Sequence, residues 1–273
     1  MTATETSRIR TSDRVRQVVV LVGAALAIVG AAWGSGAFGG TPIEDAAGGA
    51  LAADATLLAP ASPAFAIWSV IYTGLAVFAV VQAIPSRGAD PRLRSVGWLV
   101  LASMILNAAW IGVVQAGALA LSVVVIALLV ATLALIAVRL VGTRAASWLD
   151  VWSTDVPLGL YLGWASVATA ADATAWGVDV LEADAGDGAG WAVAVLVVVA
   201  VIAVAFARFT RQATALSISA GLAIAWGLAW IAYGRAEGEP HSLTVMWAAG
   251  LAACVAFAAP FAVRDFRGDS GSR

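Results

Sequence analysis

The dominant feature of this sequence is a series of long apolar runs separated by short polar segments. Hydrophobic residues make up 62% of the 273 residues, and charged residues only 12%. A soluble chain of this length would leave large apolar patches exposed, and such patches aggregate. In a bilayer, backbone groups must hydrogen-bond internally, so spanning segments are helices or a closed barrel. Barrel strands alternate apolar and polar residues, whereas runs such as Leu119–Val138 are uninterrupted. We therefore expect an all-α membrane protein.

About eight stretches are long enough to cross a bilayer, which takes ~20 mainly apolar residues. The third and fourth form one run that is too long for a single span, and Gly112, Gln115 and Gly117 mark the turn between them. The first stretch has an alternative interpretation as a cleaved signal peptide, because a basic segment precedes it. The sequence thus predicts a polytopic bundle of about eight transmembrane helices. They are Gln17–Trp33, Ala64–Ile84, Ser95–Gln115, Leu119–Val138, Val151–Ala171, Gly190–Ala207, Ala213–Tyr233 and Leu243–Val263.

The distribution of arginine supports this number of helices. The chain has no lysine, so arginine alone carries the topology signal that marks cytoplasmic loops. With a cytoplasmic N-terminus, alternation places all of the 15 arginines except Arg235 on the cytoplasmic side. The opposite loops are acidic. We predict a multi-pass protein with both termini in the cytoplasm. The composition, without lysine and rich in Ala, Val and Gly, suggests a GC-rich bacterial source and hence the bacterial plasma membrane.

Two of the outer loops, Gly34–Pro63 and Asp172–Ala189, are long and rich in Gly, Ala and Asp. We expect both to be flexible, with the alternative that the first folds over the mouth of a pocket.

Polar side chains within spans are costly and are therefore candidates for function. Asp155 precedes Pro157 and has the position of a helix cap. Asp172 lies near the outer interface, where we expect it to be solvated, and we expect Gln82 to face the headgroups. Asn107 lies in the middle of its span. It is either an interhelical hydrogen-bonding group, worth ~1 kcal/mol, or a ligand contact.

Three predicted helices each carry an aromatic residue paired with a second aromatic or polar residue on the same face, because residues three or four apart share a helix face. Any single tryptophan here is more simply explained by packing against a neighbouring helix or lipid. If the three faces converge, however, they form an aromatic pocket with a few polar groups, which is typical of a small-molecule site. The pairs are Trp68 with Tyr72, Asn107 with Trp110, and Tyr161 with Trp164.

These same positions resemble the TspO/MBR family of tryptophan-rich sensory proteins, relatives of the translocator protein. Ser62–Ala83 resembles the family's second-helix signature, in which a segment with proline leads into W-x-x-x-Y. Leu106–Trp110 is similar to its third-helix L-N-x-x-W, and Pro157–Ala170 resembles its fifth-helix P-Y-x-x-W-x-x-x-A segment. Order and spacing agree over about residues 17–176.

The resemblance implies a five-helix bundle with a pocket for tetrapyrroles such as protoporphyrin, or for sterol-like or drug ligands. Members commonly dimerise. The bundle would occupy residues 1–176, with an arginine-rich tail at 1–16, followed by an acidic outer loop at 177–189. Residues 190–273 would add about three transmembrane helices and a short cytoplasmic tail. By resemblance, the ligand-binding residues are Trp68, Tyr72, Asn107, Trp110, Pro157, Tyr161 and Trp164.

Two departures from the family pattern concern the fifth helix. Asp172 and its alanine neighbours stand where many members carry an asparagine, and the sterol motif expected after this helix is absent. A formal match to that motif on the seventh span, Leu228–Tyr233–Arg235, carries little weight because such patterns are weak.

We expect a membrane sensor or carrier that binds a flat apolar ligand such as a tetrapyrrole. The alternative is a small-molecule transporter or permease of unknown substrate. We do not expect an enzyme, because a hydrolytic triad would need His241, which has no obvious nucleophile nearby. No cluster with metal-ligand spacing occurs, and we expect no resident cofactor beyond porphyrin as a ligand. Expected partners are the lipid bilayer, a small apolar ligand and a second copy in a homodimer. A net charge of −2 offers no attraction to nucleic acid.

Overall fold

The computed structural model describes residues 9–36 and 39–263, and within them all regular secondary structure is helical. Seven helices in these described ranges are long and apolar enough to cross a membrane. An eighth long helix, α6, is more polar, but its 26 residues extend about 39 Å at about 1.5 Å per residue. The expected all-α polytopic fold is confirmed. The long helices are α1 (Thr11–Gly34), α2 (Ile67–Ala83), α3 (Pro91–Gln115), α4 (Leu119–Val141), α6 (Val156–Leu181), α7 (Ala189–Phe209), α8 (Thr214–Glu237) and α9 (Leu243–Ala262). Short elements are α5 (Trp148–Asp150), the 3-10 turns η1 (Ile43–Asp45), η2 (Ala47–Gly49), η3 (Ser62–Ala66) and η4 (Pro85–Arg87), and the π-helical turn η5 (Val151–Asp155).

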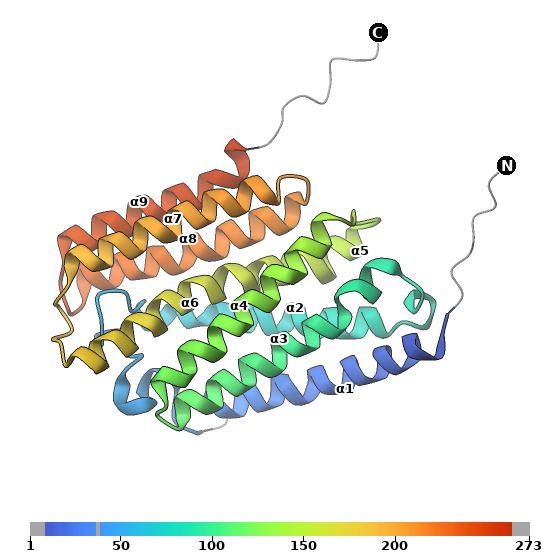
Figure 1. The fold of residues 1–273 in the computed structure, drawn as a ribbon, viewed down its shortest axis with the longest axis horizontal. Helices are drawn as coiled ribbons and strands as arrows, with labels where there is room; N and C mark the ends of the chain where they lie inside the picture. Colours follow the sequence, from blue (N-terminus) through green and yellow to red (C-terminus); the bar gives the residue numbers. More distant parts are fainter. Residues whose placement is uncertain (1–8, 37–38, 264–273) are drawn as a thin grey trace, which may run out of the picture.

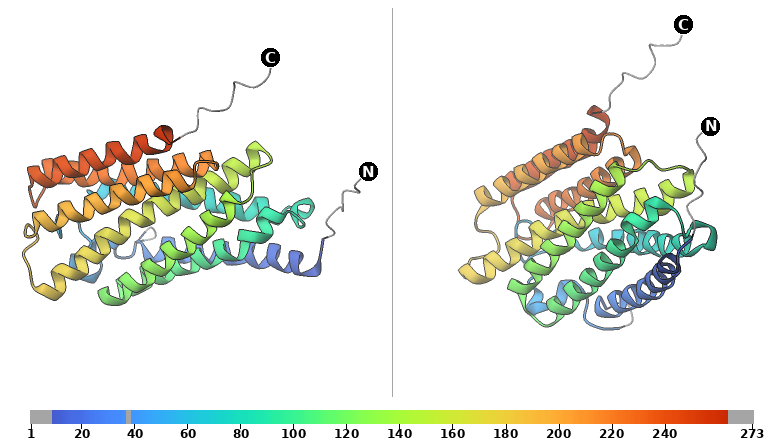
Figure 2. Two further views of the ribbon diagram at one scale, coloured as in Figure 1. Left: turned by 45° about the horizontal axis from the view of Figure 1, so that its top comes forward. Right: turned by 45° about the vertical axis from the view of Figure 1, so that its right-hand side comes forward.

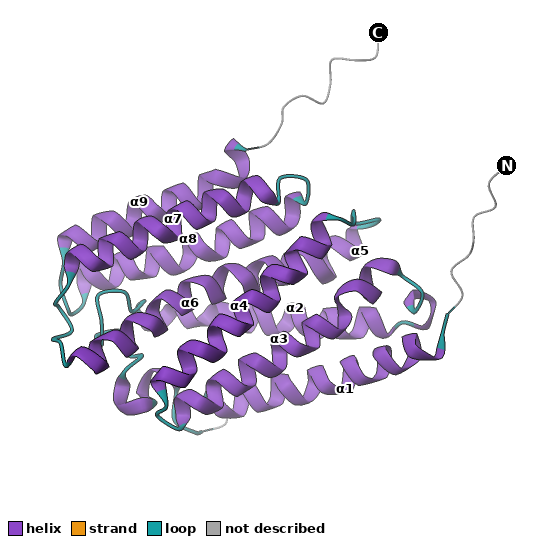
Figure 3. Ribbon diagram, viewed as in Figure 1, coloured by secondary structure: helices purple, strands orange, loops and turns teal. Residues whose placement is uncertain are grey.

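The helices run back and forth, so their connections gather at two opposite ends of the bundle (Figures 1 and 3). The N-terminus of α1 and the connections 84–90, 142–147 and 210–213 lie at one end, which we call the arginine end. The connections 35–61, 116–118, 182–188 and 238–242 lie at the other end, which we call the acidic end. Residues 1–8 and 264–273, which include four of the arginines used for the topology prediction, lie outside the described residues.

Helix boundaries differ from the prediction most at α6. This helix continues to Leu181 and so replaces the first half of the loop expected at 172–189. The sequence analysis ended this span at Ala171 because a carboxylate at position 172 was expected to be solvated, whereas the structure buries Asp172 within the helix. Elsewhere local chemistry sets the boundary as usual. The Asp90 carboxylate accepts hydrogen bonds from the backbone N–H groups of Arg92 and Leu93, and Pro91 occupies the first helical position.

The three C-terminal helices lie together along one side of the bundle, where α8 packs on α6 and α9 packs on α8 (Figures 1 and 2). Glycines on α6 allow this close approach, as small residues do in membrane bundles. A Cβ added to Gly163 would lie 2.3 Å from the carbonyl oxygen of Ala220, and one added to Gly159 would overlap Ser219.

The first outer loop folds back over the acidic end of the bundle, which is the second of the two alternatives that the sequence left open. Its Leu57 and Leu58 are buried, and its turns η1 and η2 pack against each other. Arg235, from the end of α8, is fully buried beneath the loop and donates to the carbonyl oxygens of Thr56 and Ala53 at 2.8 and 2.6 Å. The one arginine that topology placed outside therefore serves to hold this loop.

Candidate functional site

A cavity of about 380 Å³ lies between α1, α2 and α3, beneath the first outer loop. Its volume is at the lower end of the ~300–1,000 Å³ that ligand pockets usually have. The aromatic side chains come from η3, α2 and α3, and the polar groups come mainly from the loop and from η3. The lining residues are Ala32, Ser35, Pro42, Ile43, Glu44, Ser62, Phe65, Trp68, Ser69, Tyr72, Trp110 and Ile111.

Trp68 is the centre of the aromatic wall. Its ring stacks on Tyr72 with centroids 5.2 Å apart and planes inclined by 21°. It also meets Tyr161 and Trp164 edge-on, at 6.0 and 6.2 Å, and Phe65 packs against the ring of Trp164 at 5.8 Å. Such edge-to-face pairs add about 0.5–1.5 kcal/mol each beyond burial. Helices α2 and α6 therefore share a rigid aromatic cluster, of which Trp68 and Tyr72 form the face toward the cavity.

Polar groups behind this wall are only partly satisfied. The Asn107 side-chain N–H donates to the Tyr72 hydroxyl oxygen at 3.0 Å, and the Tyr161 hydroxyl donates to the carbonyl oxygen of Ser103 at 3.0 Å. Among the described residues, the buried Asn107 Oδ1 and Trp164 Nε1 atoms have no hydrogen-bond partner. A buried polar atom left unpaired costs about 1–3 kcal/mol. Both atoms would thus gain from a polar group that reached them.

Trp110 is oriented by a buried carboxylate. Its indole N–H points toward Asp172 Oδ2 at 3.4 Å, and the Ser122 hydroxyl donates to the same carboxylate at 2.9 Å. Asp172 is only 1% exposed, so the prediction that it is solvated was wrong. Its partners come from α3 and α4, which the pattern of α6 alone does not reveal. The signal that marks it is a carboxylate directly after the mainly apolar stretch of α6 that contains Tyr161 and Trp164.

Two other predictions about polar residues were wrong. Asp155 makes no helix-capping hydrogen bond; its carboxylate instead forms a buried ion pair with Arg92 of α3. Gln82 is fully buried rather than facing headgroups, because it accepts from Arg16 at 3.1 Å and donates to the backbone of Gln17 at 3.0 Å. In both cases, a partner on another helix stabilises a polar group for which the local sequence pattern had predicted a different role, a helix cap for Asp155 and a headgroup-facing position for Gln82.

The structure brings six of the seven sequence-predicted residues together. Trp68, Tyr72 and Trp110 line the cavity. Asn107 and Tyr161 lie behind it, as does Trp164, each in contact with a lining residue. Pro157 is separate: it lies at the crossing of α2 and α6, where its ring is 2.7 Å from the place a Cβ on Gly74 would take.

Sequence reasoning missed Phe65 and the polar residues Glu44, Ser62 and Ser69. Phe65 precedes Trp68 by three positions, a spacing that shares a helix face and could have identified it. Glu44 accepts a hydrogen bond from the Ser62 hydroxyl across the mouth of the cavity. No local pattern points to Glu44, because its place depends on how the loop folds.

Ion pairs tie the connections together at the arginine end. Arg87 forms ion pairs with Asp90, at 3.0 Å, and with Asp150. Burial raises the pKa of Asp150, but hydrogen bonds from Arg87 and from the backbone N–H of Ala146, together with the Arg87 charge, outweigh it and hold that pKa below its usual value. The described residues contain no group of three His, Cys, Asp or Glu side chains that could hold a metal ion.

Fold and cavity together define a polytopic helical membrane protein with an aromatic cavity between its helices that an outer loop partly covers. The family described as TSPO-like protein matches residues 17–262, from the first turns of α1 to the end of α9. The chain belongs to this family, as its resemblance to the tryptophan-rich sensory proteins indicated. The match includes α7, α8 and α9, so these helices are part of what the family model recognises. No curated protein and no solved structure matches the chain.

Proposed function

We propose that this protein is a membrane sensor or carrier that binds a flat apolar ligand, such as a tetrapyrrole, in the cavity beneath the first outer loop. The observation that carries the proposal is the wall formed by Trp68, Tyr72 and Trp110. Indole and phenol rings bind flat apolar molecules through their faces and edges. Membership of the TSPO-like family agrees with an apolar ligand.

The cavity volume of about 380 Å³ sets a condition on such a ligand. A tetrapyrrole with its side chains needs more room, so binding requires the loop to move away from the cavity. Ile43 and Glu44 of this loop form part of the lining, and Arg235 holds the loop through backbone carbonyls. We therefore propose that the ligand enters from the acidic end, with the loop as its lid.

A protoporphyrin titration of the detergent-purified protein tests this proposal. We compare wild type with the double variant Trp68→Phe/Trp110→Phe, and use Trp247→Phe as a control because Trp247 is 67% exposed on α9. Porphyrin absorbance is the readout, since tryptophan quenching would lose its nearest reporters in the double variant. We expect saturable micromolar binding that weakens in the double variant alone. Unchanged affinity in a folded double variant would place the ligand elsewhere.

The alternative function is a permease for a small molecule of unknown identity. The first outer loop, which covers the cavity at the acidic end, would be one gate of an alternating-access path. Helices α7 to α9 would help to form the remainder of that path. This alternative predicts vectorial uptake into proteoliposomes that exceeds the uptake of protein-free vesicles. Binding without uptake would leave the sensor or carrier as the function.

We propose further that the arginine end faces the cytoplasm of a bacterial cell, following the positive-inside rule. Reporter fusions at the C-terminus and in the 182–188 connection would then give opposite signals. We also propose a homodimer, which light scattering of the purified protein would detect.

A further inference from the structure

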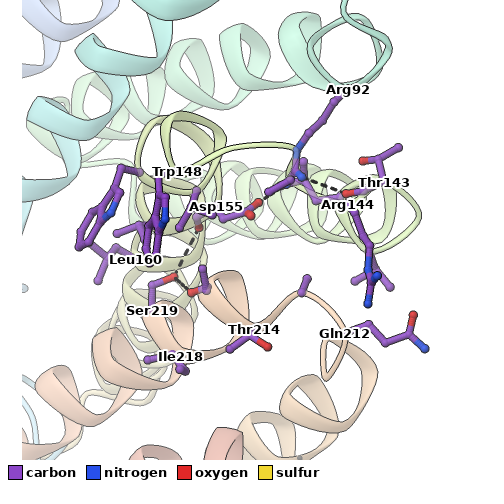
Figure 4. Close-up of a pocket in the computed structure, with 18 of the residues that line it drawn as sticks. Arg92, Thr143, Arg144, Trp148, Asp155, Leu160, Gln212, Thr214, Ile218 and Ser219 are labelled. Carbon is purple, nitrogen blue, oxygen red and sulfur yellow. Dashed lines mark hydrogen bonds and ion pairs between the residues drawn. The ribbon is translucent and has the colours of Figure 1, made fainter. Parts of the chain in front are cut away.

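A second hollow lies at the arginine end, away from the aromatic cavity. Its volume is about 840 Å³, and it is bounded by α8, by the segment from α5 to the start of α6, and by the end of α4 (Figure 4). The sides are apolar, with Leu140, Leu160, Ile218 and Leu222 among the lining residues. The π-helical turn Val151–Asp155 forms part of its wall, and such turns are frequent at functional sites.

This hollow continues into an apolar hollow of about 350 Å³ between α2, α6 and α8. The two share Val70, Leu160 and Leu222, so together they form one groove. The far end is closed by Trp226, whose indole N–H donates to the carbonyl oxygen of Ala64 at 2.9 Å. From Thr214 to Trp226 the groove follows α8 for about 18 Å at about 1.5 Å per residue. That length is close to one leaflet, which is about half of a ~30 Å hydrocarbon core.

The mouth of the groove is polar and carries one positive charge that is not neutralised. Arg92 and Asp155 compensate each other as a buried ion pair. Arg92 also donates to the carbonyl oxygen of Thr143 at 2.9 Å. Arg144 is exposed, and within the described part of the chain the side chains of Arg144, Gln212 and Thr214 have no hydrogen-bond partner. Figure 4 shows Arg144 extending toward the turn that carries Gln212.

Two exposed tryptophans flank this mouth. Trp148 and Trp152 line the hollow and are 77% and 62% exposed. Both follow the 142–147 connection at the arginine end. Exposed indole rings near the ends of spans are typical of the membrane–water interface, where one part of the ring is in lipid and the N–H reaches the headgroups. The mouth therefore lies at headgroup depth, and the apolar part of the groove runs from it into the hydrocarbon layer.

We infer that this groove binds one anionic phospholipid of the adjacent leaflet. One acyl chain lies along α8 between Thr214 and Trp226, and the headgroup phosphate is held by Arg144, Gln212 and Thr214. The single uncompensated charge favours an anionic over a zwitterionic headgroup. The length of the groove, which opens along its side to the membrane, favours an acyl chain over a soluble anion.

The test is native mass spectrometry of the delipidated full-length protein titrated with phosphatidylglycerol or phosphatidylcholine. We expect one tight site that prefers phosphatidylglycerol. Arg144→Gln should weaken it roughly fivefold, the usual effect of one basic residue near a membrane surface. Ile218→Trp should fill the groove and remove the site for both lipids. Arg211→Gln is the matched control, because Arg211 is exposed at the same end but does not line the groove.

Three results would overturn the inference. Equal affinity for both lipids would show that the groove does not recognise the headgroup. An equal loss of affinity in Arg211→Gln would show that the preference comes from general surface charge rather than from Arg144. Disulfide cross-linking between copies carrying Ile218→Cys, in a Cys254→Ser background, would show that a second copy covers the groove. Size-exclusion elution and thermal unfolding in detergent check that each variant is folded, independently of any binding at the aromatic cavity.

Discussion

Replacing Arg235 by methionine should release the outer loop and open the aromatic cavity. The Arg235 guanidinium donates to three backbone carbonyl oxygens, those of Thr56, Ala53 and Glu239, at 2.8, 2.6 and 3.0 Å. The first two belong to the loop, so this one side chain fastens the loop to the end of α8. Methionine retains most of the buried hydrocarbon but removes every donor.

The size of the effect follows from these contacts. A hydrogen bond to a charged group contributes about 1.5–3 kcal/mol, which gives about 3–6 kcal/mol for the two loop contacts. The lower value is the better estimate, because Arg235 Nε has no partner among the described residues and methionine relieves that cost. About 3 kcal/mol corresponds to roughly a hundredfold increase in the open population of the loop.

Hydrogen exchange measured by mass spectrometry reports this population directly. Backbone amides in residues 46–59 should lose about two orders of magnitude of protection in Arg235→Met, while amides in α3 keep theirs. Arg211→Met is the control, because Arg211 is exposed. Porphyrin should also associate faster with the Arg235 variant. Unchanged protection of the loop in a folded Arg235→Met protein would refute the claim that Arg235 holds the lid.

Further predictions concern the stability of the bundle, measured as thermal unfolding in detergent. Asp155→Asn should cost about 3–5 kcal/mol, because it leaves Arg92 buried without a counter-charge, and Arg92→Met/Asp155→Leu should recover most of that loss. A double variant no more stable than Asp155→Asn would argue against an uncompensated charge as the cause. Gly163→Ala should cost about 1–3 kcal/mol by overpacking the contact with α8, while Gly177→Ala on the same helix, with no neighbour within 4 Å, should cost nothing. Equal effects of the two alanines would mean that the close approach is not a constraint. The folded-state pKa of Asp150 is lowered, so its contribution is complete above the unfolded pKa of about 3.9 and is lost as the pH falls below that value. The melting temperature should therefore fall below about pH 4 by more in wild type than in Asp150→Asn; identical pH profiles would contradict this.

The predicted site residues and the observed cavity lining agree for residues whose common face follows from helical periodicity alone. Trp68 and Tyr72 share a face because they are four residues apart, and this is a local property of any helix. The local pattern left open whether α2, α3 and α6 converge. The contacts of Trp68 with Tyr161 and Trp164 join α2 to α6, and the Asn107–Tyr72 hydrogen bond joins α3 to α2. Pro157 has the family's spacing but contacts Gly74, so it fits helix crossing better than ligand contact.

The polar residues show where local patterns fail. Asp155 and Asp172 look like a cap and a solvated acid when only their neighbours in the chain are considered. Their partners, Arg92 and Ser122, are 63 and 50 positions away. Whether a carboxylate is exposed or buried depends on these distant groups, because only a partner offsets the cost of removing the charge from water.

The sequence by itself determined that this chain crosses a membrane, that its structure is helical, and which connections share an end. Those properties follow from the lengths of the apolar stretches and from the positions of the arginines. Each stretch and each arginine contributes to them independently of how the helices pack. Only the tertiary structure decided that the first outer loop covers a cavity, that Arg235 fastens it, and that an open groove runs between α2 and α8. These features arise from contacts between segments far apart in the sequence, and their free energy exists only once the helices have packed.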